Sequence, residues 1–366
     1  MTKKIYLFCP SINDGGVEKT LSIYANFLAS NFQVNLITNT FNKKRLKTFN
    51  KNVNIINFKN KFFLINRIIN NLFCVIKTLL MKERKLVIFS LHDHFFWCLL
   101  KFLKIRFKLI IRTSSAIVNE KNKTEDENIK KDFFFRKFIT SFYRYTDLLI
   151  TASEYNRLFL KNKIKAQNVK KIYNYFPKNN GFKRIKRVYN VFFIGRLVSD
   201  KDPIFFLKNC VSLSKKIKFN IGIVGKGNCY ESLKLISEKN KNVKIYGYLE
   251  NGLKKLNKKI DIICITSKYD GTPNVLGEAV SYKIPCLAPK NVGMSNVILL
   301  NGKGGYLYKS NSDTDFKKKL TSILLGYKKA INKSNYAYKK LERFNLNNTL
   351  KKLENSINKI IKKLLK

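Results

Sequence analysis

One stretch constrains the fold of this 366-residue chain more than any other, because an apolar run leads into a polar turn and then a helical pattern. The run is 262–267 (IICITS), and continuous apolar character of this length is typical of a buried parallel strand. In the turn, 270–278 (DGTPNVLGE), we expect Thr272 to be a helix N-cap and Pro273 the first helical residue, with the helix compatible over Val275–Tyr282. This order predicts the ligand-binding edge of an open α/β sheet.

Two carboxylates frame that turn, Asp270 in the loop and Glu278 on the helix. A carboxylate one turn inside the helix can accept hydrogen bonds from adjacent sugar hydroxyls, and a helix N-terminus favours phosphate. The alternative is an ordinary capped helix with two solvated acids. The stretch by itself leaves both interpretations open.

Together with Pro285 and Gly293, this pattern resembles the retaining glycosyltransferases of the GT4 family, in which the first acid is usually Glu. The resemblance implies the GT-B fold, an α/β architecture of two Rossmann-like domains that face each other across a cleft. It implies that Asp270 and Glu278 are catalytic. The donor-binding residues that it implies in this stretch are Gly271, Thr272, Pro273, Asn274, Val275 and Leu276.

Three further segments match the family in the same order along the chain. Gly15 and Gly16, after an apolar run, resemble a Gly-Gly-x-Glu loop that borders the cleft beside the donor phosphates. Gly195-Arg196 with Lys201 resembles Gly-Arg-Leu-x-x-x-Lys, which implies that Arg196 and Lys201 bind the donor pyrophosphate. The glycines of a Gly-x-Gly turn, Gly225 and Gly227, are implied to approach the nucleotide closely.

On the acceptor or sugar side, the resemblance points loosely to Arg112, with His92 as a second candidate. His92 and His94 are the only histidines, and no third metal ligand accompanies them, so we expect no metal site. Arg196, Lys201 and the helix that starts near Thr272 would neutralise a leaving diphosphate without a metal.

The length fits two α/β domains. We expect an N-terminal domain over 1–175 and a nucleotide-sugar-binding domain over 188–345, separated by a polar linker. Residues 346–366 carry apolar residues at helical spacing and are expected to pack back on the first domain, although they could equally lie on a membrane.

The charge of the chain is strongly positive, with 73 Lys+Arg against 23 Asp+Glu and a net charge of +50. Such a charge suits nucleic acid or an anionic membrane surface, but a codon bias toward lysine explains part of it. The lysines are dispersed, so we expect no nucleic-acid partner and retain the membrane surface. Segments 62–82 and 132–145 mix apolar or aromatic residues with bases, which fits either core helices or interfacial ones.

The seven cysteines show no Cys-x-x-Cys spacing and are odd in number, which favours a reducing cytoplasm over a disulfide framework. The apolar run 5–9 predicts a strand and not a signal peptide, and no uncharged apolar stretch reaches 18 residues. We therefore expect a cytoplasmic protein that is peripheral on the inner face of the cytoplasmic membrane.

These observations predict an enzyme that transfers a sugar, with retention, from a nucleoside diphosphate sugar, UDP- or GDP-linked, to a saccharide or lipid-linked saccharide in bacterial surface polysaccharide synthesis. No cofactor besides this donor substrate is expected. The alternatives are a nucleotide-sugar epimerase on the same fold, which would release free sugar, and a basic nucleic-acid-binding protein, which would need a clustered basic face.

Overall fold

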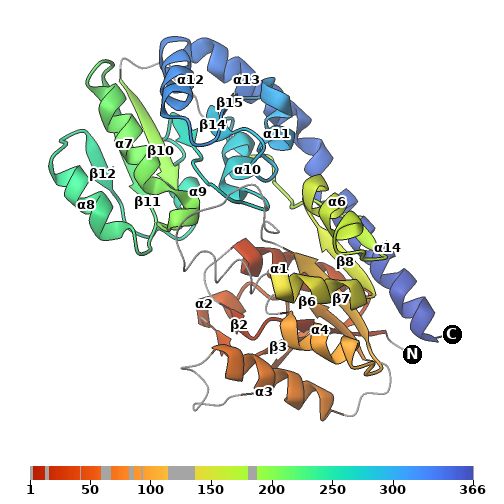
Figure 1. Ribbon diagram of the computed structural model, residues 1–366. Helices are drawn as coiled ribbons and strands as arrows, with labels where there is room; N and C mark the ends of the chain where they lie inside the picture. Colours follow the sequence, from red (N-terminus) through yellow and green to blue (C-terminus); the bar gives the residue numbers. More distant parts are fainter. Residues whose placement is uncertain are drawn as a thin grey trace. The chain divides into compact units, whose positions relative to one another are not determined.

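The computed structural model describes residues 3–12, 16–41, 43–58, 67–81, 86–91, 94–113, 137–179 and 188–365. The chain divides into two compact units (Figure 1). Unit 1 comprises Met1–Asn174 with Asn347–Lys366, and unit 2 comprises Tyr175–Leu346. Within the described ranges, no helix is long and apolar enough to cross a bilayer.

The described part of unit 1 is built on a seven-stranded parallel sheet in the order β5-β3-β1-β6-β7-β8-β9. Its strands are apolar and largely buried because helices cover the sheet. Their bounds are β1 Lys4–Phe8, β3 Gln33–Thr38, β5 Val53–Asn57, β6 Val87–Ser90, β7 Lys108–Thr113, β8 Leu148–Thr151 and β9 Val169–Lys171. Two short strands, β2 Ser11–Ile12 and β4 Thr40–Phe41, form a separate parallel pair.

The helices of unit 1 follow the strands in alternation, as a parallel sheet with crossover connections requires. They are α1 Gly16–Leu28, α2 Lys43–Leu46, α3 Arg67–Leu79, α4 Phe95–Phe102, the 3₁₀ turn η2 Phe142–Tyr145, and α6 Glu154–Asn162. The core of the unit lies between this layer and the sheet, where Trp97 packs edge-to-face on Phe8 with 5.2 Å between ring centroids.

The C-terminal helix α14 (Leu346–Leu365) belongs almost entirely to unit 1. Its apolar stripe is buried, with Leu353 and Ile357 fully inaccessible. Polar contacts also attach it to the unit, because Lys3 Nζ donates to Asn358 Oδ1 at 3.1 Å and Asn31 Nδ2 to Glu354 Oε1 at 2.7 Å. Unit 1 is thus assembled from two separate parts of the sequence.

The described part of unit 2 contains a six-stranded parallel sheet in the order β12-β11-β10-β13-β14-β15. Its strands are β10 Tyr189–Ile194, β11 Phe219–Val224, β12 Val243–Ile245, β13 Ile262–Cys264, β14 Cys286–Pro289 and β15 Tyr306–Tyr308. The first strand lies in the middle and successive strands are added to either side, which is the doubly wound Rossmann order. The predicted α/β class is confirmed.

Helices and 3₁₀ turns complete unit 2 around this sheet (Figure 1). They are η3 Ser199–Lys201, α7 Pro203–Ser214, α8 Tyr230–Glu238, α9 Gly252–Leu256, α10 Asn274–Ser281, α11 Ser295–Ile298, η4 Leu300–Gly302, α12 Asp313–Leu325, α13 Tyr327–Lys339 and η5 Lys340–Phe344. Phe206, Phe219 and Phe316 fill the centre of the core.

The structure adds detail to two predictions for unit 1, the histidine pair and the apolar segment 62–82. His94 is a structural residue, since its Nδ1 lies 2.8 Å from Ser90 Oγ just before α4 begins, while His92 lies outside the described residues. The apolar segment 62–82 is described from residue 67, and α3 is not an ordinary core helix. Cys74 and Val75 are buried, but Ile68 and Ile76 are exposed.

Candidate active site

The candidate site of unit 2 lies at the carboxyl ends of β10 and β13, the two central strands of the sheet. The chain continues from β10 to β11 on one side, whereas β13 leads to β14 on the other. Loops that leave adjacent strands in opposite directions open a crevice between them, and open α/β sheets bind their ligands there. The segments 195–202 and 265–273 follow these two strands.

The loop after β10 carries both of the predicted phosphate-binding cations. Arg196 is exposed, directly after Gly195, whereas Lys201 is half-buried in the 3₁₀ turn. Asp202 then takes a left-handed conformation (φ 47°), and its carboxylate accepts a hydrogen bond from Phe205 N at 3.1 Å. This cap starts α7 at Pro203, where the absent N–H has no cost.

Lys201 and Asp270 form an ion pair across the two loops. Their side chains retain only 21% and 12% of their exposure, so the pair is mostly shielded from solvent. The backbone beneath it is held as well, because the Thr266 hydroxyl lies 3.0 Å from Lys201 O and 2.9 Å from Asp202 O. The structure therefore brings together one cation and one acid that lie 69 positions apart in the sequence.

Helix α10 begins at Asn274, with Pro273 in the N-cap position and no side-chain cap. The prediction that Thr272 caps the helix and that Pro273 is its first residue is wrong. The Thr272 hydroxyl is buried and contacts Met294 Sδ at 3.4 Å, so it is used in packing instead. Glu278 is half-buried on this helix, one turn from its start.

The other predicted donor-binding positions of this helix divide into two groups by burial. Asn274 and Val275 are half-buried in the first turn, where helix N–H groups lack intrahelical partners. Leu276, like Gly271, is buried, and it packs the helix start into the unit. The first turn of α10 thus presents backbone N–H groups to an anionic ligand, and buried residues hold this turn in place.

Close backbone approaches explain three of the glycines. At Gly225 φ is +156°, and an added Cβ would lie 1.9 Å from Gly195 O, so the loops after β10 and β11 can meet only without a side chain. Gly227 lies in the same turn, with its own Cβ position 2.3 Å from Leu197 O. Gly293 (φ +53°) lies against the Asp270 loop in the same way, since an added Cβ would be 2.7 Å from Asp270 O.

In unit 1 the structure describes Arg112, at the end of β7, as a buried cation. Its guanidinium donates to Asn174 Oδ1 and lies over the Tyr24 ring, with 5.0 Å between Cζ and the centroid. Burial raises the pKa of Tyr24, and the Arg112 charge opposes this shift. Gly16 is the first residue of α1, while Gly15 and His92 lie outside the described residues.

Sequence reasoning missed the partners of these residues. Nothing in the position of Tyr24 along the sequence indicates an arginine above its ring. Asn174 is a polar residue three positions after the end of β9, which was an available signal. Lys268 Nζ lies 3.1 Å from Asp202 Oδ2, next to Lys201. This contact was not predictable because it depends on which strands are neighbours in the sheet. Among the residues with described positions, no group of three or more His, Cys, Asp or Glu could hold a metal.

Comparisons with known proteins agree with this fold. Residues 178–340, which lie within unit 2, match the family model described as "Glycosyl transferases group 1". The whole chain superimposes on Anabaena Alr3699/HepE in complex with UDP and glucose, with a TM-score of 0.75, 16% identity, and coverage of 98% of this chain and 100% of that one. The chain is a glycosyltransferase of the GT-B fold.

Two relatives of this glycosyltransferase have names that state an activity. A Campylobacter jejuni α-1,4-N-acetyl-D-galactosaminyltransferase, named for an undecaprenol-diphosphate-linked acceptor, is 23% identical over 331 residues, or 88% of this chain and 89% of the relative. The capsular polysaccharide biosynthesis glycosyltransferase CapH of Staphylococcus aureus is 31% identical over 142 residues, or 37% of this chain and 40% of the relative.

Proposed function

We propose that this enzyme is a GT4-type transferase that moves a sugar from a UDP- or GDP-linked donor to a saccharide or lipid-linked saccharide, with retention, in bacterial surface polysaccharide synthesis. The names of the relatives support the acceptor, since one is named for an undecaprenol-linked saccharide and another for capsule synthesis. The UDP and glucose in the HepE structure support a nucleotide-sugar donor.

The observation that carries the proposal is the Lys201–Asp270 ion pair at the carboxyl ends of β10 and β13, beside the start of α10. A diphosphate that reaches this edge meets a lysine ammonium, the exposed Arg196 and the N–H groups of a helix N-terminus. All three favour negative charge, so they stabilise the diphosphate that departs.

The proposed reaction breaks the bond between the anomeric carbon and the donor phosphate oxygen, and its electron pair leaves with the nucleoside diphosphate. The new bond forms from an acceptor hydroxyl oxygen to the same carbon, and the hydroxyl proton is released. Asp270 stabilises the positive charge that develops on the sugar, while Glu278 accepts hydrogen bonds from the ribose of the donor. Arg196, Lys201 and the start of α10 neutralise the diphosphate, so we propose that no metal is required.

On the acceptor or sugar side we propose Arg112. Its guanidinium is positioned by Asn174 and the Tyr24 ring, so its orientation does not depend on solvent. We further propose a cytoplasmic enzyme that is peripheral on the inner face of the membrane, where a lipid-linked acceptor would be presented.

The test is a transfer assay in which the purified protein is incubated with UDP- and GDP-sugars, with and without undecaprenol-linked saccharides and short oligosaccharides. We expect transfer that persists in EDTA, with a product of the same anomeric configuration as the donor by NMR. Incubation with donor alone identifies an epimerase, which would release free sugar without an acceptor. An inverted product, or an absolute need for Mg²⁺ or Mn²⁺, would contradict the proposal.

A further inference from the structure

Helix α3 of unit 1 turns an apolar face to solvent and places polar residues inside. Its inward face includes two asparagines, Asn70 and Asn71, each only 6% exposed. The outward stripe consists of Ile68, Leu72, Ile76 and, just beyond the helix, Leu80, which are 61%, 39%, 47% and 63% exposed. Their spacing of four residues lines them up along one side of the helix. Cys74 and Val75 share the buried face, so α3 buries a mixed polar and apolar face while it exposes an apolar stripe.

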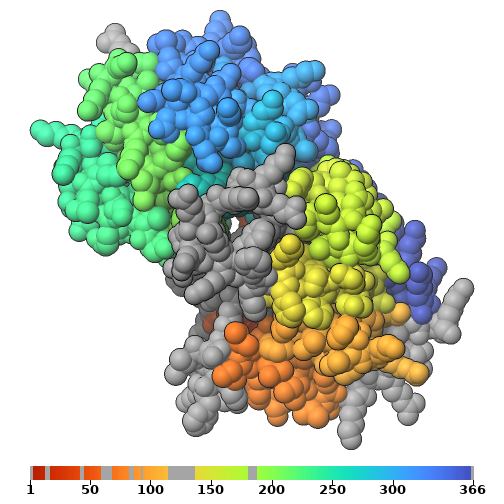
Figure 2. All heavy atoms as spheres, in the orientation of Figure 1, coloured from red at the N-terminus to blue at the C-terminus, as the bar shows by residue number. Residues whose placement is uncertain are grey.

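The surface next to α3 combines apolar and basic side chains. Helix α4 packs against both α3 and η2, and the atoms of these segments adjoin on the face that Figure 2 shows. The chain leaving α4 exposes Phe102, Leu103 and Ile105, at 46%, 59% and 41%. The exposed bases Lys104 and Arg106 alternate with them.

The segment around η2 repeats this composition. Phe138 and Tyr145 are 54% and 38% exposed, and Lys137 and Arg144 are exposed beside them. Aromatic packing joins this segment to α4, since the Phe102 and Tyr145 rings are 5.3 Å apart between centroids. Aromatic and basic side chains in this mixture are characteristic of the membrane–water interface.

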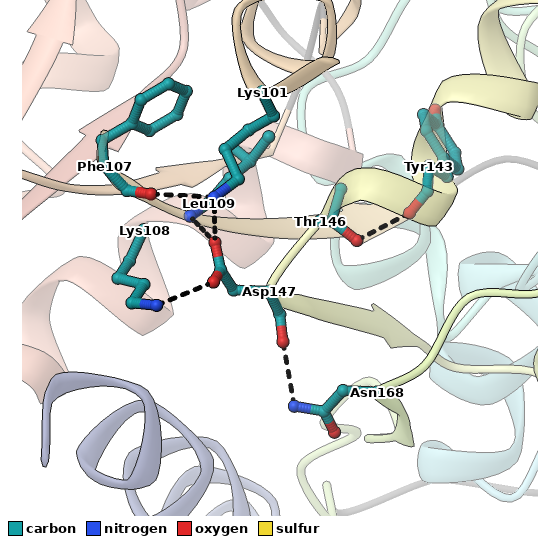
Figure 3. A network of polar contacts seen from close by, with 8 residues as sticks. All are labelled: Lys101, Phe107, Lys108, Leu109, Tyr143, Thr146, Asp147 and Asn168. Carbon is teal, nitrogen blue, oxygen red and sulfur yellow. Dashed lines mark hydrogen bonds and ion pairs between the residues drawn. The ribbon is translucent and has the colours of Figure 1, made fainter. Parts of the chain in front are cut away.

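A half-buried network of ion pairs and hydrogen bonds connects this surface to the sheet and compensates the charge of its one described acid (Figure 3). Asp147 is the only acid in the described residues of 67–113 and 137–147. Its carboxylate pairs with Lys101 Nζ at 3.0 Å and Lys108 Nζ at 3.1 Å, and it accepts from Leu109 N at 2.9 Å. Helix α4 and the chain just after η2 are thereby attached to β7, and the paired acid does not repel an anionic surface.

We propose that the outward stripe of α3 and the exposed segment 102–106 form the docking surface by which unit 1 binds an anionic phospholipid bilayer. The stripe enters the headgroup region, and the bases beside it contact lipid phosphates. This inference deepens the proposed function, because it states which part of the enzyme would meet the membrane that carries a lipid-linked acceptor.

Charge favours a bilayer over other occupants of this face. The whole chain carries +50, and the described residues around the stripe leave no unpaired acid at the surface. Each basic residue near an anionic leaflet contributes favourably to binding, in addition to the apolar area that is buried. A second copy of the chain would bring a second positive surface to the same place, which opposes self-association at low salt.

The experiment measures co-sedimentation with vesicles of phosphatidylethanolamine and phosphatidylglycerol, and with neutral phosphatidylcholine vesicles, in the absence of donor and acceptor. We expect the wild-type protein to bind the anionic vesicles and to be released by salt. The variant Ile68→Ser/Ile76→Ser should bind at least tenfold more weakly. The matched control is Leu235→Ser/Leu325→Ser in unit 2, which removes side chains that are 63% and 75% exposed and should bind like the wild type.

Equal loss in both variants, no loss in either, or dimerisation without vesicle binding would overturn the inference. If the α3 variant fails to fold by circular dichroism, Leu103→Ser in the neighbouring loop decides instead, and it should also weaken binding. Transfer to a water-soluble saccharide separates the two proposals. Failed docking with transfer intact refutes the docking surface, whereas docking without transfer refutes the proposed function.

Discussion

Because Lys201 and Asp270 form an ion pair, we expect Asp270→Asn to lower turnover without weakening nucleotide binding. Asp270→Asn keeps the size of the side chain and removes its charge. In the unliganded protein the carboxylate holds the Lys201 ammonium, so a donor diphosphate must compete with it. A pair that is exposed to 21% and 12% is worth about 1 kcal/mol. The dissociation constant of UDP or GDP should therefore stay unchanged or fall, by up to about fivefold.

Turnover should fall in Asp270→Asn, although the affinity for the nucleotide is unchanged or higher. Under the proposed function the carboxylate stabilises positive charge on the reacting sugar, and loss of one preorganised electrostatic group costs about 2.7–4 kcal/mol, or roughly 10²–10³ in kcat. Asp270→Glu should be milder, because it retains the charge and shifts it by about one ångström, a displacement to which reaction geometry is sensitive.

The measurements are calorimetric titration with UDP and GDP, and kcat at saturating donor. Lys268→Ala serves as the control, because it breaks the neighbouring ion pair with Asp202 and should leave both quantities within about twofold. Combining Asp270→Asn with Lys201→Met should abolish the gain in affinity, since no ammonium remains to be released. Weaker nucleotide binding with unchanged turnover in Asp270→Asn would show that the acid only shapes the loop.

Further predictions concern the other residues of unit 2. Glu278→Ala should abolish transfer without lowering the melting temperature, and near-normal turnover would exclude its role. Arg196→Ala and Lys201→Ala should each weaken nucleoside diphosphate binding by about 1.5–3 kcal/mol in calorimetry, and unaltered affinity would exclude a phosphate contact. Gly225→Ala should destabilise the protein by about 1–3 kcal/mol or more in urea unfolding, because its Cβ would meet Gly195 O. Gly302→Ala, which shares a positive φ but has open space, should cost less.

The sequence predicts the elements of unit 2 well where one physical signal determines them. A continuous apolar run predicted β13, and the start of α10 fell within one residue of the expected place. The cap was wrong because Thr272 has two possible uses, and burial against Met294 decides between them. The sequence shows that a hydroxyl can form a hydrogen bond, but it does not show with which partner.

Contacts between distant loops were beyond the sequence. Lys201 and Asp270 meet because β10 and β13 are neighbours, and strand order is a property of the folded sheet. The orientation of α3 is similar, because periodicity reveals an apolar stripe without stating which side faces the sheet. The apolar and basic residues of 62–82 fitted either a core helix or an interfacial one, and the structure exposes Ile68 and Ile76.

The position of α14 has a consequence for how the enzyme is made. Unit 2 is one continuous segment, 175–346, whereas unit 1 requires α14, which is synthesised after unit 2. At about 5–20 residues per second, the ribosome needs roughly 10–30 s to pass through unit 2, and during this time the surface that α14 covers is open. Residues such as Leu353 and Ile357 complete that surface only afterwards. A nascent chain therefore exposes the apolar surface of an unfinished first unit until α14 has been synthesised.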